Sequence, residues 1–230
     1  MIQENLHEVE QHIAESRSKR AANVHDEDVL LVAVTKNHDV EAMREAIDAG
    51  AGVVGENRVQ EAMDKYAKLE RDVIWHLIGH LQTNKVKQAV KIFDMIHSID
   101  SEHLAIAVNK AAASIGKVQD ILLQVNLAKE DSKFGIYKEE LPALLERVDA
   151  LSNVRLCGLM CIAPNYERVE DCRPLFHEMY EIFQKVKEMG LKTANIKYLS
   201  MGMTHDYQIA VEEGSNVVRV GTAIFGQRQY

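Results

Sequence analysis

Residues Val29–Lys36 read VLLVAVTK, an unbroken apolar run that ends in a threonine and a lysine. Continuous runs of this kind suit a strand that is covered on both faces, as in a parallel sheet. Side chains alternate along a strand, so Val32, Val34 and Lys36 share one face. If that face points into a closed barrel, the Lys36 amine lies in an apolar mouth that lowers its pKa, as Schiff-base chemistry requires. The alternative is a solvated lysine just past the end of a strand.

The same pattern recurs along the chain. Seven further strand segments follow, and they read AGVVGEN, VIWHLIG, MIHSID, DILLQVNL, VRLCGLMCI, IKYLSMG and NVVRVG. Helical stretches separate them, at about residues 40–49, 58–69, 83–90, 101–115, 138–150, 169–189 and 205–213. This alternation predicts an α/β fold, a single (β/α)₈ TIM-type barrel over residues 1–230. A doubly wound open sheet is less favoured, because no GxGxxG motif follows the first strand.

The N-terminal segment, residues 1–25, is expected to be an extra helix that packs on the barrel. Leu6, Val9, Ile13 and Ala14 form its apolar stripe among charged residues. The segment is too polar for a signal peptide, and no apolar run reaches the ~20 residues of a membrane span. We therefore expect a cytoplasmic protein without membrane contact.

The charge and the cysteine content argue against several other classes of protein. The net charge of −8 argues against binding to nucleic acid or to anionic lipid, both of which require a basic surface. Three cysteines suit a reducing compartment better than a disulfide framework. Cys157 and Cys161 are four residues apart, but no matching ligand pair accompanies them. We interpret them as buried thiols and predict no metal site.

The carboxyl ends of the strands form the functional face of such a barrel. Arg219 lies inside the apolar run of the eighth strand and needs a partner, since burying its charge alone is costly. Gly221 and Thr222 follow, and backbone N–H groups with a hydroxyl suit an anion. The seventh strand ends in Ser200, and strands seven, eight and one adjoin when the barrel closes. An anion site, an arginine and Lys36 are thus predicted at one rim, although a helix cap, a turn and an ion pair would explain Ser200, Gly221 and Arg219 separately.

Several longer motifs carry a family resemblance. The blocks GENRVQE, WHLIGHLQTNK and RVGTAIFG, with LVAVTKNHDVEAM, QVNLAKEDSKFG and LSMGMTHDYQIAVEEGSNV, occur in this chain. Together they resemble the pyridoxal phosphate homeostasis protein family, the relatives of the alanine racemase barrel domain that bind pyridoxal 5′-phosphate (PLP). The resemblance covers nearly the whole chain after the first helix. Thr35 stands where the family usually has serine, a mild departure.

The resemblance implies roles by position. Lys36 would form the Schiff base with PLP, and Arg219 would face the pyridine nitrogen. Asn57 would lie near the ring. The residues implied for the phosphate are Ser200, Gly221 and Thr222, with Met201 and Gly202 close by.

These roles favour a carrier over an enzyme. An arginine at the pyridine nitrogen disfavours its protonation, which leaves a poor electron sink. The second base of related racemases comes from a separate domain, and the sequence ends eight residues after Thr222. We therefore expect no catalytic residue and a role in PLP storage or delivery. PLP and PLP-dependent apo-enzymes are the expected partners, and a monomer is expected, with a weak dimer as the alternative.

Two other functions stay open at this point. One is a PLP-dependent amino-acid racemase with Lys36 as a base, and the other is a Schiff-base aldolase or phosphosugar-binding barrel. His80 could be catalytic, but a structural or anion-contacting role is favoured, with Gln82, Asn84 and Lys85 at the start of the next helix. The polar loop Asp131–Lys133 is interpreted as a plain surface loop rather than a lid.

Overall fold

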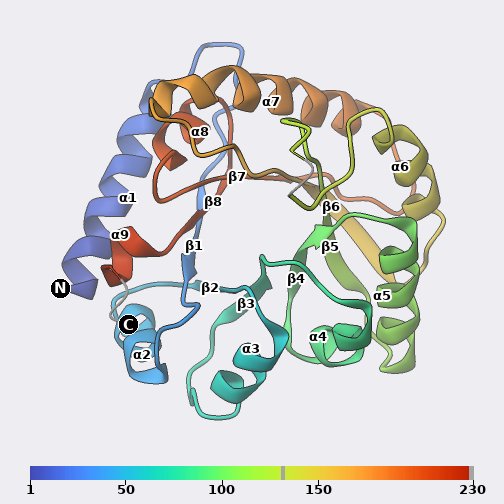
Figure 1. Cartoon of the computed structure of the whole chain (residues 1–230), viewed down its shortest axis with the longest axis horizontal. Helices are drawn as coiled ribbons and strands as arrows, with labels where there is room; N and C mark the ends of the chain where they lie inside the picture. The colour runs from blue at the N-terminus through green and yellow to red at the C-terminus, as the bar shows by residue number, and fades with distance from the viewer. Residues whose placement is uncertain (131–132, 228–230) are drawn as a thin grey trace.

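The computed structural model describes residues 1–130 and 133–227, and it shows a closed ring of parallel strands surrounded by helices (Figure 1). In the order of the chain and of the ring, the strands are β1 (Leu30–Val34), β2 (Val53–Glu56), β3 (Ile74–Leu77), β4 (Met95–Ile99), β5 (Gln119–Gln124), β6 (Val154–Met160), β7 (Tyr198–Met203) and β8 (Val217–Val220). Leu30 pairs with Val217 and Ala33 with Val220, so the first and last strands close the ring. The predicted barrel is confirmed, and the open sheet is excluded.

Helices follow the strands as predicted. They are α1 (Ile2–Ser18), α2 (Val40–Asp48), α3 (Val59–Tyr66), α4 (Val86–Ile92), α5 (Glu102–Ser114), α6 (Leu141–Asp149), α7 (Arg173–Glu188), α8 (Tyr207–Glu212) and α9 (Thr222–Phe225), with 3₁₀ turns η1 (Thr83–Lys85) and η2 (Val169–Cys172). The helices expected from residues 138 and 169 begin at Leu141 and Arg173, because a proline lies in the first turn of α6 and of α7. Proline lacks an N–H group and therefore fits only where a helix begins.

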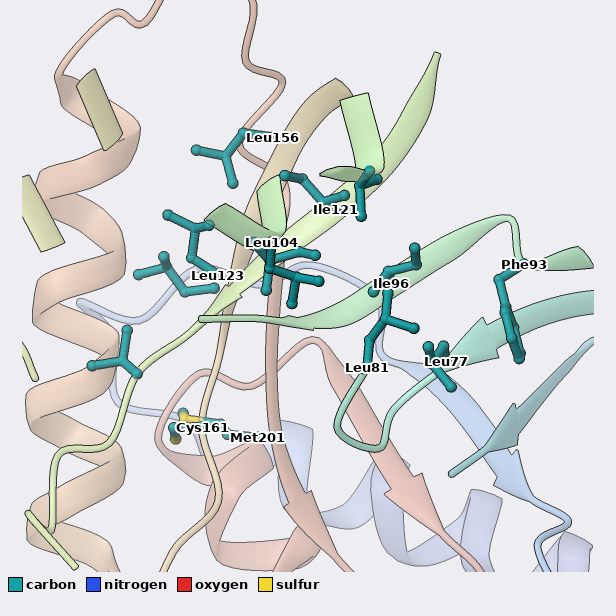
Figure 2. Packing of buried hydrophobic residues seen from close by; sticks show 14 of the residues in the cluster. Leu77, Leu81, Phe93, Ile96, Leu104, Ile121, Leu123, Leu156, Cys161 and Met201 are labelled. Atoms are coloured by element: carbon teal, nitrogen blue, oxygen red, sulfur yellow. The ribbon is translucent and has the colours of Figure 1, made fainter. Parts of the chain in front are cut away.

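The apolar side chains form separate layers inside and outside the ring. The larger cluster lies between the strands and the helices, and Figure 2 shows Leu77, Phe93, Ile121 and Met201 among its buried members. A smaller cluster around Val32, Val53 and Val217 fills the interior of the ring. Neighbouring residues on a strand therefore belong to opposite layers, and the face of Val32 points inward, which the sequence pattern had left open.

Helix α1 packs on the seam between the two ends of the chain. Its residues Leu6, Val9 and Ile13 are buried in a cluster that includes residues of β8 and α9. Asn5 Nδ2 donates a hydrogen bond to the carbonyl oxygen of Ile224 at 2.9 Å. The predicted stripe was wrong at Ala14, which is exposed. Ser16 is buried on that face instead, since it continues the helical spacing from Ile13.

Four further expectations concern membrane spans, cysteines, metal sites and one loop. Among the helices of residues 1–130 and 133–227, none combines the length and the apolar character needed to cross a membrane. Cys157, Cys161 and Cys172 are free, buried thiols, and burial raises the pKa of Cys161 to about 12. In the same residues, no group of three His, Cys, Asp or Glu side chains could hold a metal ion. Of the predicted loop Asp131–Lys133, the first two residues lie outside the described residues.

Candidate functional site

A cavity of about 500 Å³ lies at the carboxyl ends of the strands, and we call it the mouth cavity. Five residues that the sequence singled out border it, namely Lys36, Asn57, Arg219, Gly221 and Thr222. A larger cavity of about 680 Å³ lies under α1, beside Leu30 and Val53 at the starts of their strands. Because barrels of this type carry their chemistry at the carboxyl ends, the smaller cavity is the candidate site.

Arg219 forms the floor of the mouth cavity. Its side chain is buried, donating through Nη1 to Ser200 Oγ and through Nη2 to the carbonyl oxygen of Cys161 at 2.9 Å. No carboxylate within residues 1–130 and 133–227 forms an ion pair with it. Burial lowers the pKa of Arg219, but a guanidinium stays charged in proteins. The charge of Asp206 opposes this effect without forming an ion pair, and a buried cation in this position beside a cavity suits a ligand that accepts hydrogen bonds there.

A chain of hydrogen bonds extends from Arg219 into the barrel interior. Ser200 Oγ lies 3.0 Å from His97 Nδ1, and His97 Nε2 lies 3.0 Å from His76 Nδ1. With one lone pair of Ser200 Oγ accepting from Arg219, the serine hydroxyl can donate to His97 Nδ1, and the proton of His97 would then be on Nε2. Burial lowers the pKa of His76 to about 4 and that of His97 well below its ordinary value. Both rings are therefore neutral at neutral pH.

Three residues of β7 that were predicted to bind the phosphate do not border the mouth cavity, namely Ser200, Met201 and Gly202. Ser200 is buried beneath Arg219, and Met201 points outward into the helix-covered core (Figure 2). Gly202 has a φ of +97°, and an added Cβ would lie 2.6 Å from the Cβ of Ala210 in α8. Its backbone freedom thus serves the packing of β7 on α8.

Thr204, just after the end of β7, does border the mouth cavity, unlike Ser200, Met201 and Gly202. The N–H group of Gly221 donates to Thr204 Oγ1 at 3.2 Å, and both residues border the cavity beside Thr222. The Thr204 hydroxyl, held by this bond, and the Thr222 residue therefore lie at one edge, where their hydroxyl groups suit an anion such as a phosphate group. The sequence analysis missed Thr204. The strand alternation that begins at Ser200 and continues through residues 202 and 204 could have indicated it.

A buried ion-pair network supports the backbone around Lys36. Lys65 Nζ donates to Glu56 Oε1 at 2.8 Å, to Glu61 Oε1 at 2.7 Å and to the carbonyl oxygen of Thr35 at 2.7 Å. Thr35 Oγ1 donates to the same Glu56 oxygen at 2.5 Å. Burial raises the pKa of the Glu56 carboxyl group, and the charge of Lys65 opposes that effect. The residue before Lys36 is thus held through both its carbonyl oxygen and its hydroxyl group.

The residues after Lys36 are held as well. Asn37 has a φ of +63°, which asparagine tolerates, and its N–H group donates to Glu61 Oε1 at 2.6 Å. The ring of His38 stacks on Phe225 of α9, with 4.7 Å between the centroids. This contact joins the end of β1 to the segment that follows Thr222. The amine and the anion site therefore belong to one fixed rim.

The opposite rim carries Asn57, Gly79 and His80. An added Cβ on Gly79 would lie 2.3 Å from the carbonyl oxygen of Asn57, so only glycine allows the ends of β2 and β3 to approach so closely. The His80 ring stacks on Phe134 with 3.7 Å between centroids and 9° between planes. This aromatic pair borders the mouth cavity. His80 Nδ1 is 3.9 Å from an oxygen of Asp100, whose pKa burial raises.

Comparison with known proteins places this barrel in a class. A family model described as the alanine racemase N-terminal domain matches residues 4–229. Fold and mouth site together thus define a barrel of the alanine racemase type. An alanine racemase of Clostridium difficile 630 has the same fold at 17% identity, with a TM-score of 0.71 over 99% of this chain and 60% of that one.

More similar relatives identify the family within that class. The pyridoxal phosphate homeostasis protein of Aquifex aeolicus is 42% identical over 201 residues, 87% of each chain. That of Pasteurella multocida is 36% identical over 234 residues, 100% of this chain and 98% of its own. The chain belongs to the pyridoxal phosphate homeostasis protein family, as its motifs indicated. The structure of PipY from Synechococcus elongatus PCC7942, described as having PLP bound, shares 38% identity and a TM-score of 0.82, covering 98% of this chain and 100% of PipY.

Proposed function

We propose that this chain binds PLP in the mouth cavity and takes part in PLP homeostasis in the cytoplasm, as a store or a donor of the cofactor. The observation that carries the proposal is the buried Arg219, which forms no ion pair in the described residues, at the floor of a cavity that Lys36 also borders. The homeostasis proteins among its relatives and the PLP described in PipY support it.

The residues present fit the chemical groups of the cofactor. Lys36 supplies the amine that would hold the aldehyde as a Schiff base, on a backbone fixed by the Lys65 network. Thr204, Gly221 and Thr222 would bind the phosphate group at the other side of the same rim. Arg219 can only donate, so a pyridine nitrogen opposite it would accept a hydrogen bond and stay unprotonated.

The remaining predicted contacts take indirect roles in this proposal. Ser200 would act through Arg219, to which it is hydrogen-bonded. Met201 and Gly202 would shape the end of β7 through their backbone, since their packing lies on the α8 side. Asn57 would lie near the cofactor ring, because it borders the cavity on the β2 side.

A carrier role follows from the electrostatics of the floor. PLP is a stronger electron sink for carbanions when its ring nitrogen is protonated, and a neighbouring guanidinium opposes that protonation. We therefore propose that the chain does not turn over amino acids and instead exchanges PLP with apo-enzymes. A monomer suffices for this role, and sedimentation of the purified chain measures its oligomeric state.

Visible absorption spectra test the proposal directly. The purified chain should gain the visible band of a PLP Schiff base on addition of PLP, and Lys36→Ala should lose that band. Lys110→Ala, an exposed lysine on α5, is the matched control and should keep it. A wild-type chain that stays colourless would overturn the proposal and favour the sugar-binding alternative. Sustained exchange of the α-hydrogen of L-alanine with deuterium would overturn the carrier role and favour a racemase.

A further inference from the structure

A second cavity of about 400 Å³, which we call the side cavity, adjoins the mouth cavity. The two share Asn57, Gly79 and His80 in their walls. The side cavity extends from there over the start of α3 and the turn η1 that precedes α4, where Arg58 and Lys85 border it. It therefore lies on the β2 and β3 side of the rim, away from the proposed phosphate site at β7 and β8.

The walls of the side cavity carry positive charge and no carboxylate. Arg58 and Lys85 supply two cations, and neither forms an ion pair with an acid of the described residues. This is unusual for a chain with a net charge of −8. Two other surface cavities mix both signs: Arg17 with Asp26 and Asp28 under α1, and Arg44 with Glu41 beside α2. A cavity lined by cations alone is an environment for an anion.

The acids nearest to this cavity are already engaged by other groups. The charge of Arg58 contributes to lowering the pKa of Glu61, but Glu61 Oε1 accepts hydrogen bonds from Lys65 at 2.7 Å and from the N–H group of Asn37 at 2.6 Å. A carboxylate oxygen of Asp100 lies 3.9 Å from His80 Nδ1, so Asp100 is paired with that ring. Neither carboxylate borders the cavity. Arg58 and Lys85 are therefore left with solvent or an external anion to balance their charge.

The remaining walls supply further donors. Helix α3 begins at Val59 without a capping side chain, so the N–H groups of its first turn have no partner within the helix. The side-chain amides of Gln60 and Gln82 border the same space. Arg58, Lys85 and these amides could surround an oxyanion with charged and neutral donors.

We propose that the side cavity is a second anion-binding site, which takes the carboxylate or phosphate group of a small molecule bound beside the mouth cavity. That this molecule would lie next to PLP rests on the proposed function, whereas anion binding by the side cavity does not. A small amine that carries such a group would have its charged end held here while its nitrogen reaches the mouth cavity through the shared wall at Asn57 and His80.

Calorimetric titration tests this site with two probes, inorganic phosphate and succinate, at low ionic strength. Arg58→Gln combined with Lys85→Gln removes both cations from the side cavity. The matched control, Lys87→Gln with Lys91→Gln, removes two exposed cations from α4 outside the cavity. We expect the first double variant to bind at least one probe about tenfold more weakly or worse than wild type, and the control to bind it nearly as well.

Titrations are run on the chain with and without PLP. In the loaded chain the proposed phosphate site is filled, so phosphate reports on the side cavity alone. In the unloaded chain any phosphate bound at Thr222 is common to both double variants, and their difference still isolates the side cavity. Tighter binding of succinate would identify the charged group held in the side cavity as a carboxylate. Tighter binding of phosphate would identify it as a phosphate group.

Three results would overturn the proposal. Wild type could bind neither probe, the variant without Arg58 and Lys85 could bind as tightly as wild type, or both double variants could weaken equally and reveal a diffuse charge effect. Failure of the chain to bind PLP would overturn the proposed function but not the anion site, because the titrations of the unloaded chain do not depend on PLP binding.

Discussion

Arg219 and Ser200 are hydrogen-bonded to each other inside the closed barrel, with Nη1 as the donor and Oγ as the acceptor, and both side chains are shielded from solvent. The bond connects the floor of the mouth cavity to His97 and His76. Arg219 therefore lies at one end of a chain of hydrogen bonds that extends from the mouth cavity into the barrel interior.

Ser200→Ala should lower the free energy of unfolding by about 1–3 kcal/mol, because it leaves a buried charged donor and a buried imidazole nitrogen without their partner. It should also weaken PLP binding, since the guanidinium loses one of its two anchors. Urea denaturation and PLP titration measure the two effects. Ser98→Ala is the matched control, because Ser98 is equally buried but its hydroxyl has no partner. Similar losses in both variants would show that the hydrogen bond to Arg219 contributes nothing.

The stability of the protein should fall as the pH falls from 7 to 4, partly because of His76. Its pKa is lowered from 6.5 to about 4 by burial, so the unfolded chain binds a proton in this window that the folded chain does not. Stability from this group is present above the unfolded pKa and is lost as the pH falls towards the folded one, by roughly 3 kcal/mol. Urea denaturation at pH 7 and pH 4.5 should show a shallower loss in His76→Gln than in wild type. If His76→Gln and wild type lost the same free energy of unfolding between pH 7 and pH 4.5, this role of His76 would be contradicted.

Lys65→Met should destabilise the chain by about 3–5 kcal/mol, because the fully buried carboxylate of Glu56 then has no cation. It should also weaken PLP binding, since the carbonyl oxygen of Thr35 loses its donor next to Lys36. Lys68→Met, an exposed lysine just after α3, should change neither property. Thermal and urea unfolding with PLP titration provide the readouts. The double variant Glu56→Gln/Lys65→Met should regain part of the stability, and no recovery would mean that packing rather than charge dominates.

Gly79→Ala should destabilise the chain by about 1–3 kcal/mol and reduce PLP affinity, because its Cβ would lie 2.3 Å from the backbone of Asn57. The ends of β2 and β3 would have to separate, and with them the wall shared by the two cavities. Gly52→Ala is the control, since its Cβ would meet nothing within 4 Å. The added methyl group lowers the conformational entropy of the unfolded chain, so the free energy of unfolding of Gly52→Ala should be unchanged or slightly higher. Equal behaviour of the two variants in urea denaturation would argue against the close approach.

The barrel and the position of the site could be predicted from the sequence, because both depend on local pattern. Apolar runs that end in polar residues, repeated along the chain, indicate parallel strands and the rim where their ends meet. Lys36 and Arg219 were visible as charged residues at or within such runs, and the structure places both at the mouth cavity.

Features that depend on distant contacts could not be predicted in this way. His76 and His97 come from separate strands, and only the closed ring brings them to Ser200. The register shift of β7 against β8 between Ser200 and Met203 also depends on the neighbouring strand and is not visible in the sequence pattern. The cations of the side cavity adjoin only because α3 and η1 begin at neighbouring strand ends.

The pairing of β1 with β8 also determines when a nascent chain acquires its ligand pocket. Lys36 follows the first strand of the ring and Arg219 lies on the last, and α1 must dock onto α9 across that same junction. Neither side of the cavity is formed without the other. Ring closure joins residues that are far apart in the sequence, and it is therefore the folding step that a bound ligand would stabilise most.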